Sequence, residues 1–312
     1  MERYQAMTGI VDMEVVALLA VLLIGLILAR VAALGEFFSK DGADGKPLPN
    51  RGESGREPDS FPTPLDYGIA QTTGNRQLQA DRAEVSMSSA GILAVLADGI
   101  GKENTGQVCA QIGLDTVLDA YEPYRELHNP EYFFRTVFGE AHLRIQRTIG
   151  VRYGGACLAA AFVSGAALHY ALAGDIRIAL WRNGELIPLS KGHTLDVMAV
   201  QAYEEGKLSK REAVWSMEEK RCWNYLGMDG FHEIELADRP VRLRAGDRVV
   251  MASKGIWQEL SWAELEDILA EGGGCQKQAA QAVGEAEKKP GGDKENGSIV
   301  VFFVPTSGGG VR

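Results

Sequence analysis

Several features that mark other protein classes are missing from this chain. Its 312 residues include only four cysteines and no CxxC pair, so there is neither a dense disulfide framework nor zinc-knuckle spacing. There is no internal repeat and no phosphate-binding loop of the GxGxxG or GxxxxGK[ST] type. The cysteines are expected to be isolated buried thiols in a reducing compartment; they are Cys109, Cys157, Cys222 and Cys275.

A strongly basic surface is also missing. The formal net charge is -10 at pH 7, and no basic stripe interrupts it. Because an acidic surface repels nucleic-acid phosphates, no nucleic-acid partner is expected. The content of 46% hydrophobic and 24% charged residues is ordinary for a globular protein, so most of the chain should fold around a core.

One long hydrophobic run is present near the N-terminus. Residues 15–29 are all apolar or Gly, and the run extends through Arg30 to residue 34, which gives about the 20 residues that a membrane helix needs. Residues 1–14 are not the basic leader of a signal peptide, so an uncleaved transmembrane helix over residues 15–34 is favoured over a cleaved signal peptide. Lysines and arginines follow the run, which predicts a short extracytoplasmic N-terminus, residues 1–14, and a cytoplasmic C-terminal domain.

The remaining domain boundaries follow from composition. Residues 35–68 are rich in Gly, Pro, Ser and charge without periodicity, which predicts a flexible tether. A folded domain is expected over residues 69–304 and a flexible tail over residues 305–312.

The folded part alternates strand-like and helix-like stretches. Strands are expected at residues 92–97, 158–163, 169–173, 176–181, 248–252 and 299–304, and helices at residues 107–121, 131–149, 208–220, 262–271 and 276–287. Asn183-Gly184 is the strongest hairpin signal. Hairpin strands mixed with helix pairs predict an α+β fold in which helices are layered on antiparallel sheets.

Short motifs, in order along the chain, resemble those of the metal-dependent PPM-type (2C-class) Ser/Thr protein phosphatases. Residues 76–81, Arg-Gln-Leu-Gln-Ala-Asp, resemble the family's Arg-x-x-Asn-Glu-Asp, and residues 97–101, Ala-Asp-Gly-Ile-Gly, are similar to its Ala-Asp-Gly-Met-Gly. Residues 155–158 stand where Gly-Thr-Thr-Leu is usual, and residues 174–177 resemble a Gly-Asp-Ser-Arg turn. Ser-Lys-Gly-Ile at residues 253–256 resembles Ser-Asp-Gly-Leu, and Glu295-Asn296 stands in place of Asp-Asn.

The resemblance covers about residues 69–304 and implies a specific architecture and chemistry. The fold it implies is a sandwich of two packed antiparallel β-sheets flanked by helix pairs. The activity it implies is hydrolysis of phosphoserine and phosphothreonine by a water bound to two Mg²⁺ or Mn²⁺ ions, which prefer oxygen ligands and lower the pKa of bound water.

The resemblance also assigns residues. Asp98 matches the carboxylate that bridges both metals, and Gly99 matches a carbonyl metal ligand. Arg76 matches the catalytic arginine that binds the substrate phosphate, which suits its planar fork of donors. Asp81 is a nearby supporting acid, and Glu295 matches the last metal ligand with a longer side chain.

Three positions depart from the family pattern. Lys254 replaces a metal-ligating aspartate, Ala80 replaces a glutamate, and Arg152 stands where an aspartate for an accessory metal is expected. An ammonium about 4 Å from a divalent ion would be repelled by ~8 kcal/mol at an effective dielectric of about 20. Lys254 is therefore expected to pair with Asp98 or Glu295, to act as a neutral base, or to point to solvent beside a weak one-metal site at Asp98 and Gly99.

Three functions remain open. The first is a membrane-anchored pseudophosphatase with lost or weakened activity, which binds a phosphoprotein or regulatory partner and holds one Mg²⁺ or Mn²⁺ ion or none. The second is an active metal-dependent Ser/Thr phosphatase. The third is a structural component of a membrane assembly.

Overall fold

The structure is a computed structural model that describes residues 66–124, 126–216 and 221–303. The predicted N-terminal segment 1–14, transmembrane helix 15–34, tether up to residue 65 and tail 305–312 lie outside these ranges. Among the described residues, no helix has the length and apolar character required to cross a bilayer.

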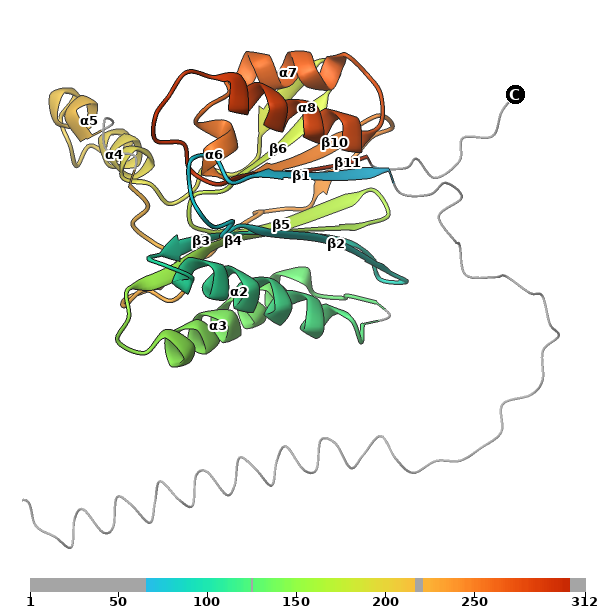
Figure 1. Ribbon diagram of the computed structural model, residues 1–312. Helices are drawn as coiled ribbons and strands as arrows, with labels where there is room; N and C mark the ends of the chain where they lie inside the picture. The colour runs from blue at the N-terminus through green and yellow to red at the C-terminus, as the bar shows by residue number, and fades with distance from the viewer. Residues whose placement is uncertain (1–65, 125, 217–220, 304–312) are drawn as a thin grey trace, which may run out of the picture. The chain divides into compact units, whose positions relative to one another are not determined.

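Two antiparallel sheets are stacked at the centre of the domain (Figure 1). The first sheet has the order β1 (Tyr67–Thr72), β11 (Gly297–Phe303), β10 (Arg248–Ala252), β6 (Arg177–Arg182), β7 (Glu185–Pro188). The second has the order β2 (Arg82–Ser88), β3 (Gly91–Gly101), β4 (Gly154–Ser164), β5 (Ala167–Ala173), β8 (Glu235–Leu236), and β9 (Val241–Arg242) also pairs with β5. The predicted pair of antiparallel sheets is confirmed.

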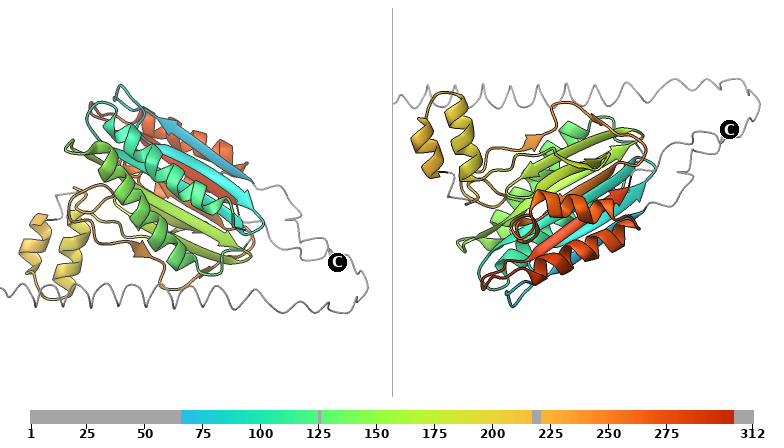
Figure 2. Two further views of the ribbon diagram at one scale, coloured as in Figure 1. Left: turned by 90° about the horizontal axis from the view of Figure 1, so that it is seen from below. Right: turned by 90° about the horizontal axis from the view of Figure 1, so that it is seen from above.

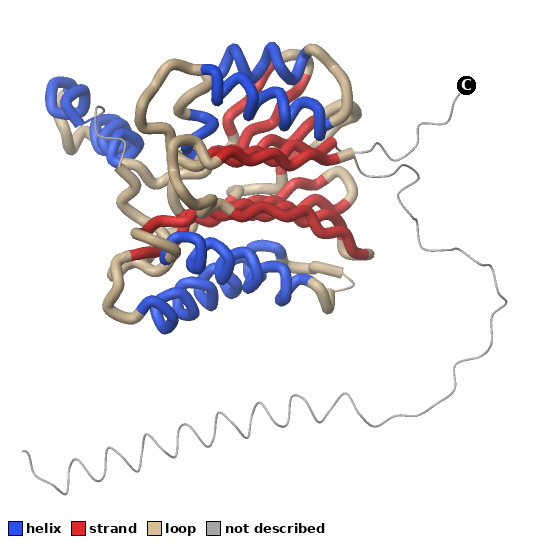
Figure 3. Tube along the Cα trace, viewed as in Figure 1, coloured by secondary structure: helices blue, strands red, loops and turns tan. Residues whose placement is uncertain are grey.

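Helices cover the outer face of each sheet (Figure 3). The second sheet is covered by α2 (Thr105–Tyr121) and α3 (Pro130–Ile149). The first is covered by α7 (Trp262–Ala270), α8 (Cys275–Lys288) and the short α6 (Lys254–Trp257). At one side of the sandwich, α4 (Leu195–Glu204) and α5 (Lys210–Ser216) pack against each other (Figure 2).

The buried side chains form three layers, which follow from strand periodicity. Alternate residues of a strand face opposite sides of a sheet. In β3, Leu93 and Val95 face α2 and α3, whereas Ala94 and Leu96 face the other sheet. Each fully buried Leu, Ile or Phe contributes about 1.5–3 kcal/mol. The same alternation aims Asp98 into the space between the sheets, at the end where the apolar core stops.

Most elements expected from the sequence are found, with differences at their ends. The hairpin at Asn183-Gly184 joins β6 to β7, with φ of 54° and 90° at these residues, as a type I′ turn requires. The helix expected at residues 208–220 is described only as the shorter α5. The expectations did not include α4, β1 or β2.

Candidate functional site

A cleft of about 620 Å³ opens at one edge of the sandwich, where loops from both sheets meet. Six of the eight residues singled out from the sequence line it: Arg76, Ala80, Asp98, Gly99, Lys254 and Glu295. Asp81 lies beneath the cleft and is fully buried. Arg152 does not line the cleft; its guanidinium donates to the Ile149 and Thr148 carbonyls at the end of α3.

Two glycines allow the loops to approach closely enough to form this cleft. A Cβ on Gly99 would lie 2.2 Å from the carbonyl oxygen of Gly106, at the start of α2. A Cβ on Gly255 would lie 2.2 Å from the carbonyl oxygen of Asn296. Because Gly255 follows Lys254 and Asn296 follows Glu295, this second contact holds the two charged residues side by side.

Lys254 forms an ion pair with Glu295 in the cleft. Its Nζ donates to Glu295 Oε1 at 2.9 Å, and the two side chains are 28% and 42% exposed. Burial alone would lower the pKa of the lysine, but the hydrogen bond to Glu295 and the charges of Glu295, Asp175 and Asp98 raise it above its usual value. Of the three arrangements considered for Lys254, the structure therefore has the ion pair.

Two buried acids lie next to this pair. Asp81 Oδ2 accepts hydrogen bonds from the hydroxyls of Ser253 at 2.8 Å and Ser298 at 2.7 Å. Burial nevertheless raises the pKa of Asp81 to about 6. For Asp98, burial and then the charges of Asp81 and Glu295 raise the pKa well above the usual value. Both acids hold protons more firmly than exposed carboxyls do.

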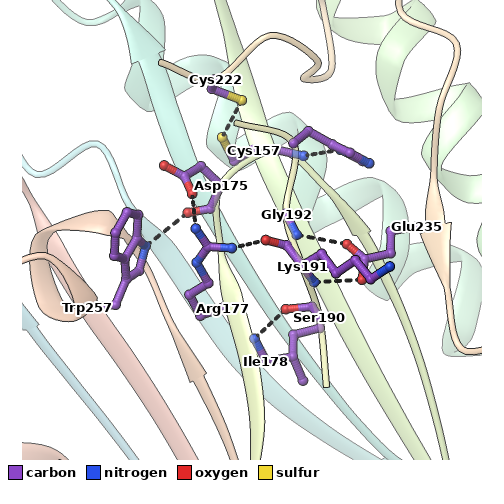
Figure 4. A network of polar contacts seen from close by, with 12 residues as sticks. Cys157, Asp175, Arg177, Ile178, Ser190, Lys191, Gly192, Cys222, Glu235 and Trp257 are labelled. Carbon is purple, nitrogen blue, oxygen red and sulfur yellow. Dashed lines mark hydrogen bonds and ion pairs between the residues drawn. The ribbon is translucent and has the colours of Figure 1, made fainter. Parts of the chain in front are cut away.

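Asp175, between β5 and β6, is a cleft residue to which the sequence analysis gave no role. Both of its carboxylate oxygens are buried without a hydrogen-bond donor, and the Arg177 guanidinium lies 3.5 Å away (Figure 4). Burial raises the pKa of Asp175 to about 7, although Arg177 and Lys254 oppose this. The Gly-Asp-Ser-Arg-like turn was the signal that could have identified it.

The Asp175 turn is held by contacts from α6 and from the loop after β7. Trp257 Nε1 donates to the Asp175 carbonyl at 3.2 Å, and the Arg177 guanidinium stacks on the Trp257 ring, 4.7 Å from its centroid. Arg177 also donates to the Lys191 carbonyl (Figure 4). These contacts fix the backbone on either side of the Asp175 carboxyl group.

Arg76 lies at the mouth of the cleft and pairs with an exposed acid. Its guanidinium is 2.8 Å from Asp293, and the two side chains are 43% and 83% exposed. Such an exposed pair is weak, so a phosphate could displace Asp293. Ala80 contributes only its backbone, whose N–H donates to Asn296 Oδ1 at 2.8 Å.

Two of the cysteines are neighbours in the cleft rather than isolated thiols. The Sγ atoms of Cys157 and Cys222 are 4.0 Å apart, and Cys222 is half-buried. The hydrogen bond to Cys222 and burial raise the pKa of Cys157 well above its usual value. The expectation of isolated buried thiols is therefore wrong for this pair, whereas Cys109 and Cys275 are buried in separate clusters.

The charge of the cleft is close to balanced. Its acidic lining residues are Asp98, Glu103, Asp175 and Glu295, and its basic ones are Arg76, Arg221 and Lys254. Because Asp98 and Asp175 have raised pKa values, the cleft is less negative near neutral pH than this count indicates. The arrangement is suited to binding an anion at the cationic side chains.

The residues do not fit the two-ion site that the resemblance implies. In the described ranges, no three or more His, Cys, Asp or Glu side chains are grouped so that they could hold a metal ion. The Lys254 ammonium occupies the space beside Glu295. Bound divalent ions would be repelled by the ammonium.

Solved structures of serine/threonine phosphatases share this fold. The chain is similar to the Mycobacterium tuberculosis serine/threonine phosphatase PstP/Ppp, at 22% identity and a TM-score of 0.62, over 77% of this chain and 98% of that one. It is similar to the PPM Ser-Thr phosphatase MsPP from Mycobacterium smegmatis, solved with cacodylate, at 21% identity and a TM-score of 0.62, over 76% and 97%. The PstP catalytic domain solved with two manganese ions matches at 20% identity and a TM-score of 0.59, over 77% and 97%. No family model and no curated protein sequence matches the chain.

Proposed function

We propose that this chain, which has the fold of the PPM-type Ser/Thr phosphatases, is a membrane-anchored pseudophosphatase. Its cleft binds phosphoserine or phosphothreonine on a partner protein and hydrolyses it slowly or not at all. The cytoplasmic domain acts as a phosphoprotein-binding or regulatory module, held at the membrane by residues 15–34.

One observation carries the proposal: the 2.9 Å ion pair between Lys254 and Glu295. The ammonium neutralises Glu295, which is the acid that the resemblance assigns to a metal. A fixed cation at this point also repels a second cation. The cleft therefore contains the fixed positive charge of the Lys254 ammonium where the resemblance implies exchangeable metal ions.

The same cations favour phosphate as the ligand. Arg76 offers a planar fork of N–H donors at the mouth of the cleft, and its pair with Asp293 is exposed and easily displaced. Lys254 lies further in and keeps its proton because of Glu295. A phosphate that reaches both groups gains charge-assisted hydrogen bonds, each stronger than one between neutral groups.

A binding and turnover assay on the full-length protein in detergent tests the proposal. A phosphoserine peptide is expected to bind, the unphosphorylated peptide is not, and the protein is expected to release little or no inorganic phosphate in millimolar Mn²⁺. Arg76→Ala should weaken phosphopeptide binding by about tenfold or more, because a hydrogen bond to a charged group is lost. The proposal fails if phosphorylation of the peptide makes no difference to binding.

The second candidate, an active Mg²⁺- or Mn²⁺-dependent phosphatase, is favoured by Asp175. Its two carboxylate oxygens, which accept no hydrogen bond, lie in the same cleft as Asp98, and carboxylate oxygens are the ligands that these ions prefer. Phosphate release that requires Mn²⁺ and is lost in Asp98→Ala would establish this candidate and rule out the pseudophosphatase.

A further inference from the structure

Two thiols that lie far apart in the sequence meet inside the cleft. Cys157 and Cys222 are separated by 65 positions, yet their sulfur atoms are 4.0 Å apart, and both line the cavity (Figure 4). Cys222 also donates its S–H to the Asn224 carbonyl at 3.3 Å. The S–H of Cys157 is therefore the one that points at the Cys222 sulfur.

We propose that Cys157 and Cys222 are a site of reversible oxidative modification, at which a peroxide converts the two thiols into an intramolecular disulfide that cross-links the wall of the cleft. Nothing in the proposed phosphate binding uses these sulfurs, so the site is independent of it.

The local geometry permits the bond. The sulfurs must approach from 4.0 Å to about 2.05 Å. Cys157 is fixed within β4, opposite Asp98 of β3, whereas Cys222 lies outside the helices and strands and forms an isolated bridge with Thr194, the residue before α4. The Cys222 segment can therefore supply the movement.

A glycine leaves space for the buried sulfur. Gly174 has φ of +110°, and a Cβ at this position would lie 2.4 Å from the Cys157 Sγ. Any other residue at position 174 would push the Cys157 side chain. The Cys157 sulfur thus faces the cleft with Cys222 as its sulfur neighbour.

The difference in exposure sets the order of the steps. Cys222 is half-buried at the cleft and Cys157 is 2% exposed, so the peroxide reaches Cys222 first. The Cys222 thiol gives its proton to solvent and the thiolate attacks one peroxide oxygen. The O–O bond breaks and the leaving oxygen takes up a proton, so Cys222 sulfenic acid and an alcohol or water are formed. The Cys157 sulfur then attacks the sulfenic sulfur, which releases water and forms the S–S bond.

The cross-link would join two parts of the domain that meet at the cleft. Cys222 belongs to the segment that follows α4 and α5, whose connection to the sandwich includes the hydrogen bond from Trp223 N–H to the His193 carbonyl. Cys157 belongs to the central strand beside Asp98. Oxidation therefore fixes the position of that segment relative to the floor of the cleft.

The test is hydrogen peroxide treatment of the folded full-length protein in detergent, followed by alkylation, digestion without reductant and mass spectrometry. We expect the peptides that contain Cys157 and Cys222 to be joined with the loss of two hydrogen atoms, and to separate after dithiothreitol. Cys109 and Cys275, which are 0% exposed, should stay reduced and become alkylated only once the protein is unfolded. They serve as internal controls.

Two variants test the order of steps. In Cys222→Ser, a change at a half-buried position, Cys157 should stay reduced at the same peroxide concentration. In Cys157→Ala, Cys222 should accumulate as a sulfenic acid that dimedone traps. Thermal unfolding curves verify that each variant is folded.

Three results would overturn the inference. One is that both thiols stay free at peroxide concentrations that oxidise free glutathione. The others are that the bond forms only after the protein is unfolded in urea, or that Cys157 of folded wild type pairs with Cys109 or Cys275. None of these results depends on whether a phosphopeptide binds.

Discussion

The cleft contains two kinds of ionisable side chain: buried carboxyl groups with raised pKa values and basic groups that stay positively charged. Asp98 and Asp175 are buried with raised pKa values, whereas Lys254 keeps its proton through Glu295. Arg76 lies at the mouth with a weak, exposed partner. The result is a cleft that can accept an anion near neutral pH.

The buried Asp175 carboxyl should make stability fall as the pH rises. Its pKa is about 7 in the folded state and about 3.8 without burial, so the folded state binds the extra proton. That stability is fully present below about pH 4 and is lost as the pH rises through about 7. In urea unfolding, wild type should lose about 2–3 kcal/mol more than Asp175→Asn between about pH 5 and pH 8.

Asp119→Asn, a change at an exposed position on α2, is the matched control. It should leave the pH dependence as in wild type. Equal slopes for wild type and Asp175→Asn would show that the Asp175 carboxyl is already ionised at acidic pH, contrary to its burial.

Asp293 should compete with phosphate for Arg76. Because the pair is exposed, its removal in Asp293→Asn should raise phosphopeptide affinity by only about two- to fivefold. Fluorescence anisotropy with a labelled phosphopeptide measures the change. The double variant with Arg76→Ala should show no such gain, and a gain that persists there would assign the effect to overall charge instead.

Among the elements, tight loop contacts rather than long helices position the site. The start of α6 rests directly on the loop before β11, because Gly255 has no Cβ. The positions of β3 and β10 could be predicted from the sequence, since short apolar runs at residues 92–97 and 249–252 mark them. The turn at residues 174–177 marks Asp175 in the sequence, but the contact of this turn with Trp257 of α6 could not be predicted, because 82 positions separate the two residues.

Gly255→Ala should disturb the Lys254–Glu295 pair and destabilise the fold. The new Cβ meets backbone atoms at 2.2 Å, and such overpacking costs about 1–3 kcal/mol. Gly284→Ala, in α8 with nothing within 4 Å of the added Cβ, should instead stabilise by about 0.5–1 kcal/mol. Urea unfolding of both variants measures the contrast, and equal effects would contradict the close contact at Gly255.

For the molecule as a whole, the order of the motifs along the chain allowed the sandwich to be predicted. It did not allow the contacts between distant residues to be predicted. The resemblance gave two antiparallel sheets and placed six residues in one cleft. It did not show that the Arg152 side chain donates to the last carbonyls of α3, because the register there is not fixed by a motif. Nor could spacing bring Cys157 and Cys222 together, since 65 positions separate them.

The proposed anchor predicts how the whole chain partitions. Wild type should enter the detergent phase of a Triton X-114 separation. Leu23→Asp combined with Leu26→Asp should move the protein to the aqueous phase, because each aspartate at the centre of a membrane helix costs about 2.5–3.5 kcal/mol. The control is Leu23→Ile with Leu26→Ile, which should behave as wild type. Wild type in the aqueous phase would refute the anchor.

The central claim is that Lys254 takes the place of a divalent ion in the cleft. Isothermal titration of millimolar Mn²⁺ into the full-length protein in detergent tests it most directly, with Lys254→Asp measured alongside. We predict no saturable binding to wild type and measurable binding to Lys254→Asp, because the substitution replaces a repelling charge with an oxygen ligand. Saturable binding of two Mn²⁺ ions to wild type would contradict the account.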